Sequence, residues 1–368
     1  MTTHINYSTS DEIVAAQDVV ATEEQASALS MPPLIIEENL RSYLDTEGVG
    51  SGPMEIERIG AGQSNVTFRV RREGADVVLR RGPRPPLPKS THDMVREARV
   101  QTALAGAGFP VPNLRCVETD TAVLGVPFYV MDYLDGDVVT SVLPERFQPS
   151  EHRHHLVKSA VETLGQLHSL DVRQPPISEL GRPDGYLRRQ VKRFSELWPQ
   201  NTTRDLPIVE ELGTWLEKNR PQSQRHGVIH GDYRIGNLMF AKEDKPRVLA
   251  VLDWEMATLG DPLADLGYLA ATYATCESGS TVMELTSVTR DHGFPTRDEL
   301  IELYAENSSL DLSELHWYEV LALWKAAIFC EAIYTRWLKG ERADDAQFSR
   351  HLESGVPDLL EAALQRTR

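Results

Sequence analysis

Short apolar runs, alternating with polar residues and turns, dominate the first third of the chain. A glycine-rich bend at residues 60–65 lies between two of them and predicts a hairpin. A proline-rich loop then precedes a helix expected from about residue 91 to 107. The runs expected to form strands are 55–59, 66–71, 77–80, 114–118 and 128–131.

Beyond a turn at Asp135-Gly136 the apolar positions follow a helical period. Leu156, Ala160 and Leu164 lie on one face of a helix that should end near Leu170. A proline-rich and charged segment follows, then a compact β-rich block at 228–253, and then further helices. We therefore predict an α+β fold with a small antiparallel lobe and a larger, mainly helical one.

Three parts are expected along the chain. Residues 1–32 are polar and acidic and should form a mobile tail. Residues 33–134 should form the N-terminal lobe, with a short helix near residues 36–44 before its strands, and residues 135–368 the C-terminal lobe. A chain of 368 residues has ample length for two lobes with a sizeable core.

Charge and cysteine content narrow the classes of function. The formal net charge is −17, which disfavours binding to nucleic acid or to an anionic membrane but allows a local basic pocket. The cysteines Cys116, Cys276 and Cys330 form no CxxC pair and indicate free thiols in a reducing compartment. With no signal-peptide pattern and no long apolar run, we expect a cytoplasmic protein without a membrane span or an evident obligate protein partner.

The β-rich block carries the candidate chemistry. Residues 238–240 and 248–252 should form an antiparallel hairpin, which brings Asn237, before the first strand, beside Asp253, after the second. Asp232 lies one short loop earlier. An amide oxygen and two carboxylates around one point suit Mg²⁺ with phosphate oxygens. The Asp-x-x-x-x-Asn spacing, with an Asp after the next hairpin, is also that of a kinase catalytic loop.

These residues resemble the motifs of the aminoglycoside phosphotransferase family, especially the kinase-like domains related to those fused to acyl-CoA dehydrogenases. The resemblance rests on His230-Gly231-Asp232, Asp253-Trp254-Glu255 and Gly260-Asp261-Pro262 with Asp265. It implies a bilobal protein-kinase-like fold and an ATP-dependent phosphotransferase with an alcohol group as acceptor; GTP is not excluded. Asp232 would accept or orient the proton of the substrate hydroxyl, while Asn237 and Asp253 would hold Mg²⁺ on the nucleotide.

The same resemblance assigns nucleotide-binding roles in the first lobe. Gly60, Gly62, Ser64 and Asn65 form the turn whose N–H groups would cap the phosphates. Arg80 stands where kinases carry a lysine, with Glu97 placed to pair with it and Arg81 able to share its role. Met131 and Tyr133 would contact the adenine edge as a hinge. The alternative for Arg80 and Glu97 is an ion pair with a purely structural role. The alternative for the segment of Met131 and Tyr133 is a buried strand without a role in nucleotide binding.

Three further residues of the C-terminal block are considered for structural roles: His230, Asp261 and Asp265. His230 is expected to be a hydrogen-bonding residue rather than an acid or base. Asp261 is expected to cap a helix that begins at Pro262, while Asp265 either braces the catalytic loop or stabilises the helix dipole.

The acceptor is the least specified part. Arg188, Arg189, Lys192 and Arg193 would form a basic stripe if their segment is helical, and would suit an anionic small-molecule hydroxyl substrate such as a hydroxyacyl-CoA. A solvated helix face is the alternative. At the level of the whole protein, the alternative is a catalytically weak kinase-like module that binds nucleotide or acyl-CoA. A dehydrogenase is disfavoured because the glycine-rich turn lacks a third glycine and lies in a hairpin.

Overall fold

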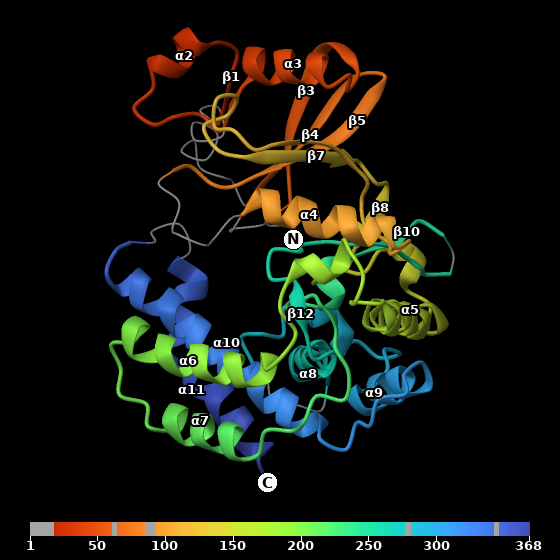
Figure 1. The fold of residues 1–368 in the computed structure, drawn as a ribbon, viewed down its shortest axis with the longest axis vertical. Coiled ribbons are helices and arrows are strands. Elements are labelled where there is room, and N and C mark those ends of the chain that lie inside the picture. The colour runs from red at the N-terminus through yellow and green to blue at the C-terminus, as the bar shows by residue number, and fades with distance from the viewer. Residues whose placement is uncertain (1–17, 61–64, 86–92, 244, 277–280, 342–345) are drawn as a thin grey trace, which may run out of the picture. The chain divides into compact units, whose positions relative to one another are not determined.

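The computed structural model describes residues 18–60, 65–85, 93–243, 245–276, 281–341 and 346–368. The chain divides into two compact units: the first contains residues up to 105 together with 112–134, and the second contains 106–111 and 135–368 (Figure 1). The α+β class expected from the sequence is confirmed.

The first unit is built on a five-stranded antiparallel sheet in the order β3-β4-β5-β7-β6. Alternation along β5 explains its two faces: Val77 and Leu79 join one apolar cluster, and Val78 joins the other. The second cluster includes Met94 and Ala98 of helix α4 (Met94–Gly106). The strands are β3 (Ser51–Ile59), β4 (Val66–Glu73), β5 (Ala75–Arg81), β6 (Leu114–Glu118) and β7 (Phe128–Asp132).

An N-terminal segment covers the other face of this sheet. Strand β1 (Val19–Val20) pairs in parallel with β2 (Ile35–Ile36), with α2 (Glu23–Ser27) between them, and α3 (Glu37–Thr46) follows. The Asp18 carboxylate is buried and pairs with Arg58 at 2.8 Å and with Arg84 at 2.6 Å. Part of the segment expected to be a tail is therefore attached to the first unit, through these ion pairs at Asp18, the pairing of β1 with β2, and a hydrogen bond from Arg84 to the carbonyl of Pro32. Residues 1–17 lie outside the described residues.

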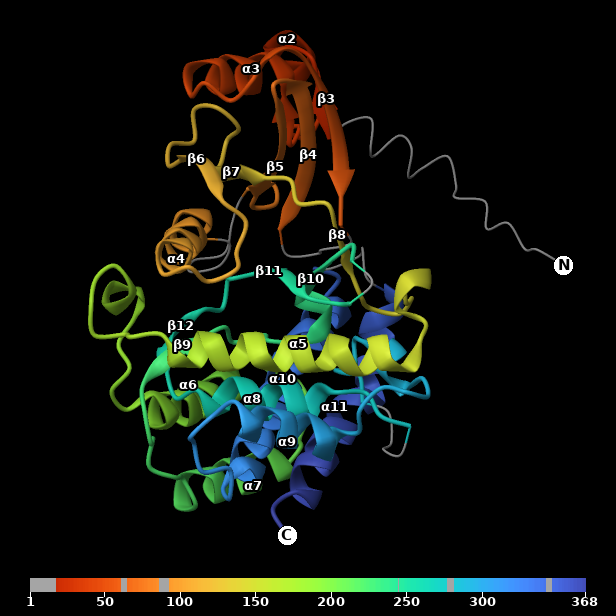
Figure 2. The same cartoon turned by 90° about the vertical axis from the view of Figure 1, so that its right-hand side faces the viewer.

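The second unit combines two small sheets with helices. Its sheets have the orders β11-β10-β8 and β12-β9. Figure 2 shows α5 running beside β9 and β11, and the hydroxyl of Ser159 on α5 accepts from the N–H of Val248 at 2.9 Å. The strands are β8 (Gly136–Val138), β9 (Gly227–Ile229), β10 (Leu238–Ala241), β11 (Val248–Val251) and β12 (Thr258–Gly260).

Helices α6, α7, α8 and α11 pack against α10, whose residues are mostly buried. The α-helices are α5 (Ser150–Ser169), α6 (Tyr186–Asn201), α7 (Ile208–Lys218), α8 (Leu263–Thr272), α9 (Arg297–Glu306), α10 (Leu315–Leu338) and α11 (Ala346–Gln365). The short 3₁₀ helices are η1 (Glu145–Phe147), η2 (Ile177–Leu180), η3 (Ile235–Asn237) and η4 (Ser287–Arg290). Within the described ranges, none of the helices is both long and apolar enough to cross a bilayer.

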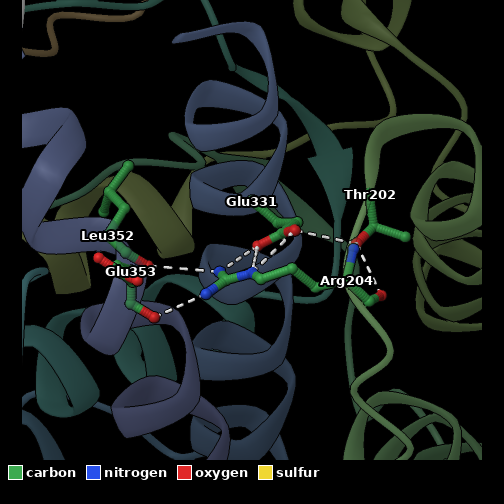
Figure 3. A network of polar contacts seen from close by, with 5 residues as sticks. All are labelled: Thr202, Arg204, Glu331, Leu352 and Glu353. Atoms are coloured by element: carbon green, nitrogen blue, oxygen red, sulfur yellow. Dashed lines mark hydrogen bonds and ion pairs between the residues drawn. The ribbon is translucent and has the colours of Figure 1, made fainter. Parts of the chain in front are cut away.

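A polar network ties the loop after α6 to α10 and α11 (Figure 3). The fully buried Glu331 of α10 accepts from Arg204 Nε at 3.0 Å and from the Thr202 hydroxyl at 2.9 Å. Arg204 also donates to the backbone carbonyls of Leu352 and Glu353 on α11. Glu331 thus joins α10 to the loop after α6, and Arg204 joins the same loop to α11.

Candidate active site

The predicted hairpin is present and forms the frame of the site. Strands β10 and β11 are antiparallel, with Leu238 opposite Val251. The N–H of Leu252 donates to the carbonyl of Asn237 at 2.9 Å, which extends the pairing by one step. Because Asp253 follows Leu252 directly, the hairpin holds the backbones of Asn237 and Asp253 side by side, as its sequence pattern requires.

Asp232 lies in the loop before η3, and its carboxylate accepts two side-chain hydrogen bonds and forms one longer ion pair. The Tyr268 hydroxyl donates to Oδ1 at 2.5 Å, and Asn237 Nδ2 donates to Oδ2 at 2.8 Å. Arg234 Nε lies 3.6 Å from Oδ2. The Asp232 side chain remains 29% exposed, so a carboxylate of fixed orientation is still reachable from solvent. The amide nitrogen of Asn237 is thereby engaged, and its oxygen is the atom suited to a cation.

The loop that carries Asp232 is fixed from below by Asp265 of α8. The two carboxylate oxygens of Asp265 accept from the backbone N–H groups of His230 at 2.7 Å and Gly231 at 2.8 Å. Gly231 has a φ of +88°, and a Cβ there would lie 2.8 Å from Met256, so only glycine fits. Asp265 therefore braces the loop that carries Asp232, one of the two roles expected of it.

His230 has the structural role expected of it. Its ring is fully buried, with Nε2 2.9 Å from the carbonyl of Leu252 and Nδ1 3.2 Å from the N–H of Asp232. These partners require a neutral ring that donates from Nε2 and accepts at Nδ1. His230 therefore ties the loop of Asp232 to the end of the hairpin.

Asp261 likewise behaves as a cap. Its Oδ1 accepts from the N–H of Leu263 at 3.1 Å, and its Oδ2 accepts from the Tyr318 hydroxyl at 2.9 Å. Burial raises the pKa of the Asp261 carboxyl above its usual range, and the hydrogen bonds from Tyr318 and Leu263 partly oppose this shift.

Asp253 adopts a left-handed backbone conformation with φ of +66°. The next residue, Trp254, is fully buried, donates from Nε1 to the carbonyl of Val251 at 2.9 Å and lies 4.6 Å from the His230 ring. The chain must therefore turn sharply at Asp253 to place Trp254 in the core. This turn leaves the Asp253 side chain only partly buried, at the end of the hairpin.

The donor set fits a nucleotide-bound Mg²⁺ better than an isolated metal centre. Mg²⁺ commonly takes one or two protein oxygens and completes its shell with phosphate oxygens and water. Asn237 and Asp253, whose backbones the hairpin places side by side, are the residues that could supply such a pair. Across the part of the chain that the structure describes, no group of three His, Cys, Asp or Glu residues could hold a metal alone.

Two residues of this site were missed by the sequence analysis. Tyr268 and Arg234 both contact the Asp232 carboxylate. Burial and the charge of Asp232 raise the pKa of Tyr268 well above its ordinary value, so Tyr268 remains a donor. A usable signal was the position of Tyr268 one helical turn after Asp265, on a helix whose start had been recognised.

In the first unit, Arg80 and Glu97 form the ion pair expected from their spacing. Arg80 Nε lies 3.1 Å from Glu97 Oε1, and Glu97 is almost fully buried. Tyr129 of β7 donates to the same oxygen at 3.1 Å. Arg81 points to the opposite face, where it is buried and donates to the carbonyls of Leu34 and Gly82, so it does not share the role of Arg80.

The other nucleotide-binding residues are only partly described. Gly60 follows β3 with a φ of +77°, which glycine adopts readily, and Asn65 is buried before β4. Gly62 and Ser64 lie outside the described residues. Met131 is buried in β7, and the N–H of Tyr133 donates to the carbonyl of Asp76 at 3.2 Å. For the N–H of Tyr133 to bind adenine, its hydrogen bond to Asp76 would first have to break.

The four basic residues of α6 differ in their local contacts. Arg189 donates to the carbonyls of Arg182 and Asp184 and so closes the loop before its own helix. Lys192 is 74% exposed and lies 3.7 Å from Glu196. Arg188 lines a cavity of about 380 Å³ with Arg220 and His226, and Arg193 is exposed. Among the contacts described above, Arg189 and Lys192 have partners close by in the chain, whereas Arg188 and Arg193 have none.

Comparison with known proteins places this geometry in a family. The model of a phosphotransferase enzyme family matches residues 55–302. Acyl-CoA dehydrogenase family member 10 of Mus musculus is 32% identical over 345 residues, which cover 92% of this chain and 32% of that protein. The chain thus spans about a third of the length of this curated relative.

Solved structures show the same fold. A candidate aminoglycoside phosphotransferase from Ralstonia eutropha superposes with a TM-score of 0.73 at 26% identity, covering 89% of this chain and 98% of that one. A spectinomycin phosphotransferase solved with ADP and spectinomycin gives a TM-score of 0.58 at 12% identity, covering 88% and 98% of the two chains. The fold is therefore protein-kinase-like, and the chain belongs to the phosphotransferase enzyme family.

Proposed function

We propose that this protein is a Mg²⁺-dependent phosphotransferase that moves the γ-phosphoryl group of ATP to a hydroxyl of a small molecule. The observation that carries the proposal is the Asp232 carboxylate, held by Tyr268 and Asn237 beside the end of the hairpin. A carboxylate held this way can orient a hydroxyl without having to be reorganised during the reaction. The family and the ADP-bound relative of the same fold support nucleotide as the donor.

Each assigned residue then has a definite task. Asp232 accepts the hydrogen bond of the acceptor hydroxyl and takes its proton as the new oxygen–phosphorus bond forms and the bond to ADP breaks. Asn237 and Asp253 would hold Mg²⁺, which supplies charge neutralisation on the phosphate oxygens when bound. Arg80, fixed by Glu97, would contact the nucleotide phosphates, as would the turn at Gly60 and Asn65. Met131 and Tyr133 would contact the base.

For the acceptor we propose a hydroxyacyl-CoA. Support comes from the relative that bears the name of an acyl-CoA dehydrogenase, of which this chain matches one part. Arg188 and Arg193 of α6 could meet the phosphates of such a substrate, whereas Arg189 and Lys192 are engaged locally. An aminoglycoside, being cationic, would instead favour a cluster of carboxylates at the acceptor site.

The proposal is tested by measuring ADP release over aminoglycosides, sugars, amino alcohols and hydroxyacyl-CoAs, with Asp232→Asn as the blank. We expect Asp232→Asn to keep Mg²⁺-dependent ATP binding and to lower turnover by about 10²-fold or more, the usual contribution of a positioned proton acceptor. Asp171→Asn, at an exposed surface position, is the matched control and should retain normal turnover. Near-normal turnover in Asp232→Asn would remove Asp232 from the mechanism.

A second candidate is a kinase-like module that binds nucleotide or acyl-CoA with little transfer. The arginine at position 80, where kinases carry lysine, favours it, because a guanidinium is bulkier and its donors form a fixed fork. Tight binding of ATP without ADP release over the whole acceptor series, in the presence of Mg²⁺, would favour this second function.

A further inference from the structure

Helix α10 carries a lysine inside a largely buried segment. Lys325 is half-buried, between the buried residues Trp324 and Ala326. Its Nζ donates to Oε1 of Gln190 on α6 at 2.8 Å and lies 4.9 Å from the centre of the Phe194 ring. Among the described residues, no carboxylate forms an ion pair with this ammonium group.

Such an arrangement is costly unless a further partner arrives. A buried ammonium normally pairs with an anion, because a neutral amide and an aromatic ring replace only part of its hydration. The pKa of Lys325 is lowered to about 8, chiefly by burial; the negative charge of Asp265 opposes this shift, and the positive charge of Arg193 contributes to it. Lys325 therefore carries its charge at neutral pH; it feels the charge of Asp265, but among the described residues no carboxylate forms a direct ion pair with it.

The position of Lys325 relates it to the catalytic loop. The charge of Asp265 raises the pKa of Lys325, and the Asp265 carboxylate also accepts from the backbone N–H groups of His230 and Gly231, next to Asp232. Tyr268, one turn after Asp265 on α8, donates to Asp232. Helix α8 packs against α10, and α10 packs against α6 (Figure 1). All these elements belong to the second unit.

One large apolar side chain close to Lys325 along α10 is exposed. Phe329 follows one turn later on the same face of α10 and is 61% exposed. A cation beside an exposed aromatic ring suits a ligand that has a negatively charged group joined to an apolar part.

We propose that Lys325, with Gln190 and Phe194, forms a subsite for a negatively charged group of the acceptor. This inference rests on the proposed function, and it deepens it by assigning charge selectivity to a residue outside the α6 arginines. A carboxylate or phosphate of the acceptor would supply a direct counter-ion. Lys325 would then act on acceptor affinity and not on the chemical step.

The test compares binding of three probes to the full chain without nucleotide: 3-hydroxybutyrate, its uncharged amide and 3-hydroxybutyryl-CoA. Ligand-observed NMR gives the affinities. We expect the wild type to bind the two anionic probes at least tenfold more tightly than the amide. Lys325→Met should weaken the anionic probes by tenfold or more and leave the amide unchanged. Lys325→Arg should stay within about threefold of the wild type.

Lys192→Met is the matched control, because Lys192 is exposed and paired with Glu196, and it should change none of the affinities. For any acceptor that is turned over, Lys325→Met should raise KM and change kcat by less than about threefold. If Lys325→Met does not fold, the wild type still provides a test. The affinity for 3-hydroxybutyrate should fall as pH rises through about 8, where Lys325 loses its proton, while that for the amide stays constant.

Equal binding of the anionic probes by the wild type and Lys325→Met would overturn the subsite, as would a wild type that does not discriminate by charge. Charge-selective binding without any ADP release would instead contradict the phosphotransferase activity and leave the subsite standing. Acceptor-dependent ADP release whose KM and kcat are the same in the wild type and in Lys325→Met would support the phosphotransferase activity and contradict the subsite. The two proposals therefore fail in different ways.

Discussion

At the scale of single residues, the backbone of Asp253 connects structure to function. Apart from glycines, no other residue in the described ranges has a positive φ. The left-handed conformation costs a residue with a Cβ about 1–2 kcal/mol, and less for Asp or Asn. The fold accepts this cost where the hairpin ends and Trp254 enters the core. Backbone strain at such a point is expected at a functional site.

We predict that Asp253→Asn keeps the stability of the wild type and loses Mg²⁺-dependent ATP binding. Asparagine tolerates the left-handed conformation, but it lacks the charge that a hard cation prefers. Asp253→Ala should lose the same binding and also about 1 kcal/mol of stability. Calorimetric titration with and without Mg²⁺, together with thermal unfolding, separates the two effects. Metal-dependent ATP affinity in Asp253→Asn would contradict the assigned role.

At the scale of elements, Arg80 and Glu97 join strand β5 to helix α4. Glu97 is nearly inaccessible to water, so its carboxylate depends on Arg80 and Tyr129 for its partners. This pair has two readings: a structural link between strand and helix, or a support that aims Arg80 at phosphate. The geometry is the same in both, so a functional measurement must separate them.

We predict that Arg80→Met raises KM for ATP by tenfold or more, whereas Arg80→Lys stays within about fivefold because it retains a positive charge. Arg71→Met, which removes an exposed ion pair with Glu55, is the control and should alter neither KM nor stability appreciably. If Arg80 is purely structural, Arg80→Met lowers the unfolding midpoint but leaves KM of the folded fraction unchanged.

At the scale of the whole molecule, the stability of the second unit depends on contacts between segments far apart in sequence. Glu331 is fully buried and binds Arg204 and Thr202, while Arg204 reaches α11. Removing one partner of a buried pair leaves the other charge without compensation.

We therefore predict that Glu331→Ala destabilises the protein by roughly 3 kcal/mol. Glu353→Ala is the control: the backbone carbonyl of Glu353 contacts Arg204 and its side chain is exposed, so the change should stay within about 0.5 kcal/mol. Chemical denaturation of the two variants measures the difference. Equal midpoints would show that the network (Figure 3) contributes little.

The sequence by itself determined the elements and the local part of the site. Short apolar runs separated by turns predicted strands β3 to β7. Two further apolar runs, 238–240 and 248–252, predicted the hairpin in which Leu252 donates to Asn237. These features depend on neighbours along the chain or across one turn, which a pattern of residues records directly.

Only the tertiary structure decided which distant side chains meet at the site. Tyr268 reaches Asp232 from α8, and Lys325 meets Gln190 from a helix more than a hundred residues later. The same applies to Asp18, whose buried carboxylate fixes residues that look like a tail. Such contacts arise from how helices and strands pack, and a charged residue in a sequence carries no record of the partner that packing will bring to it.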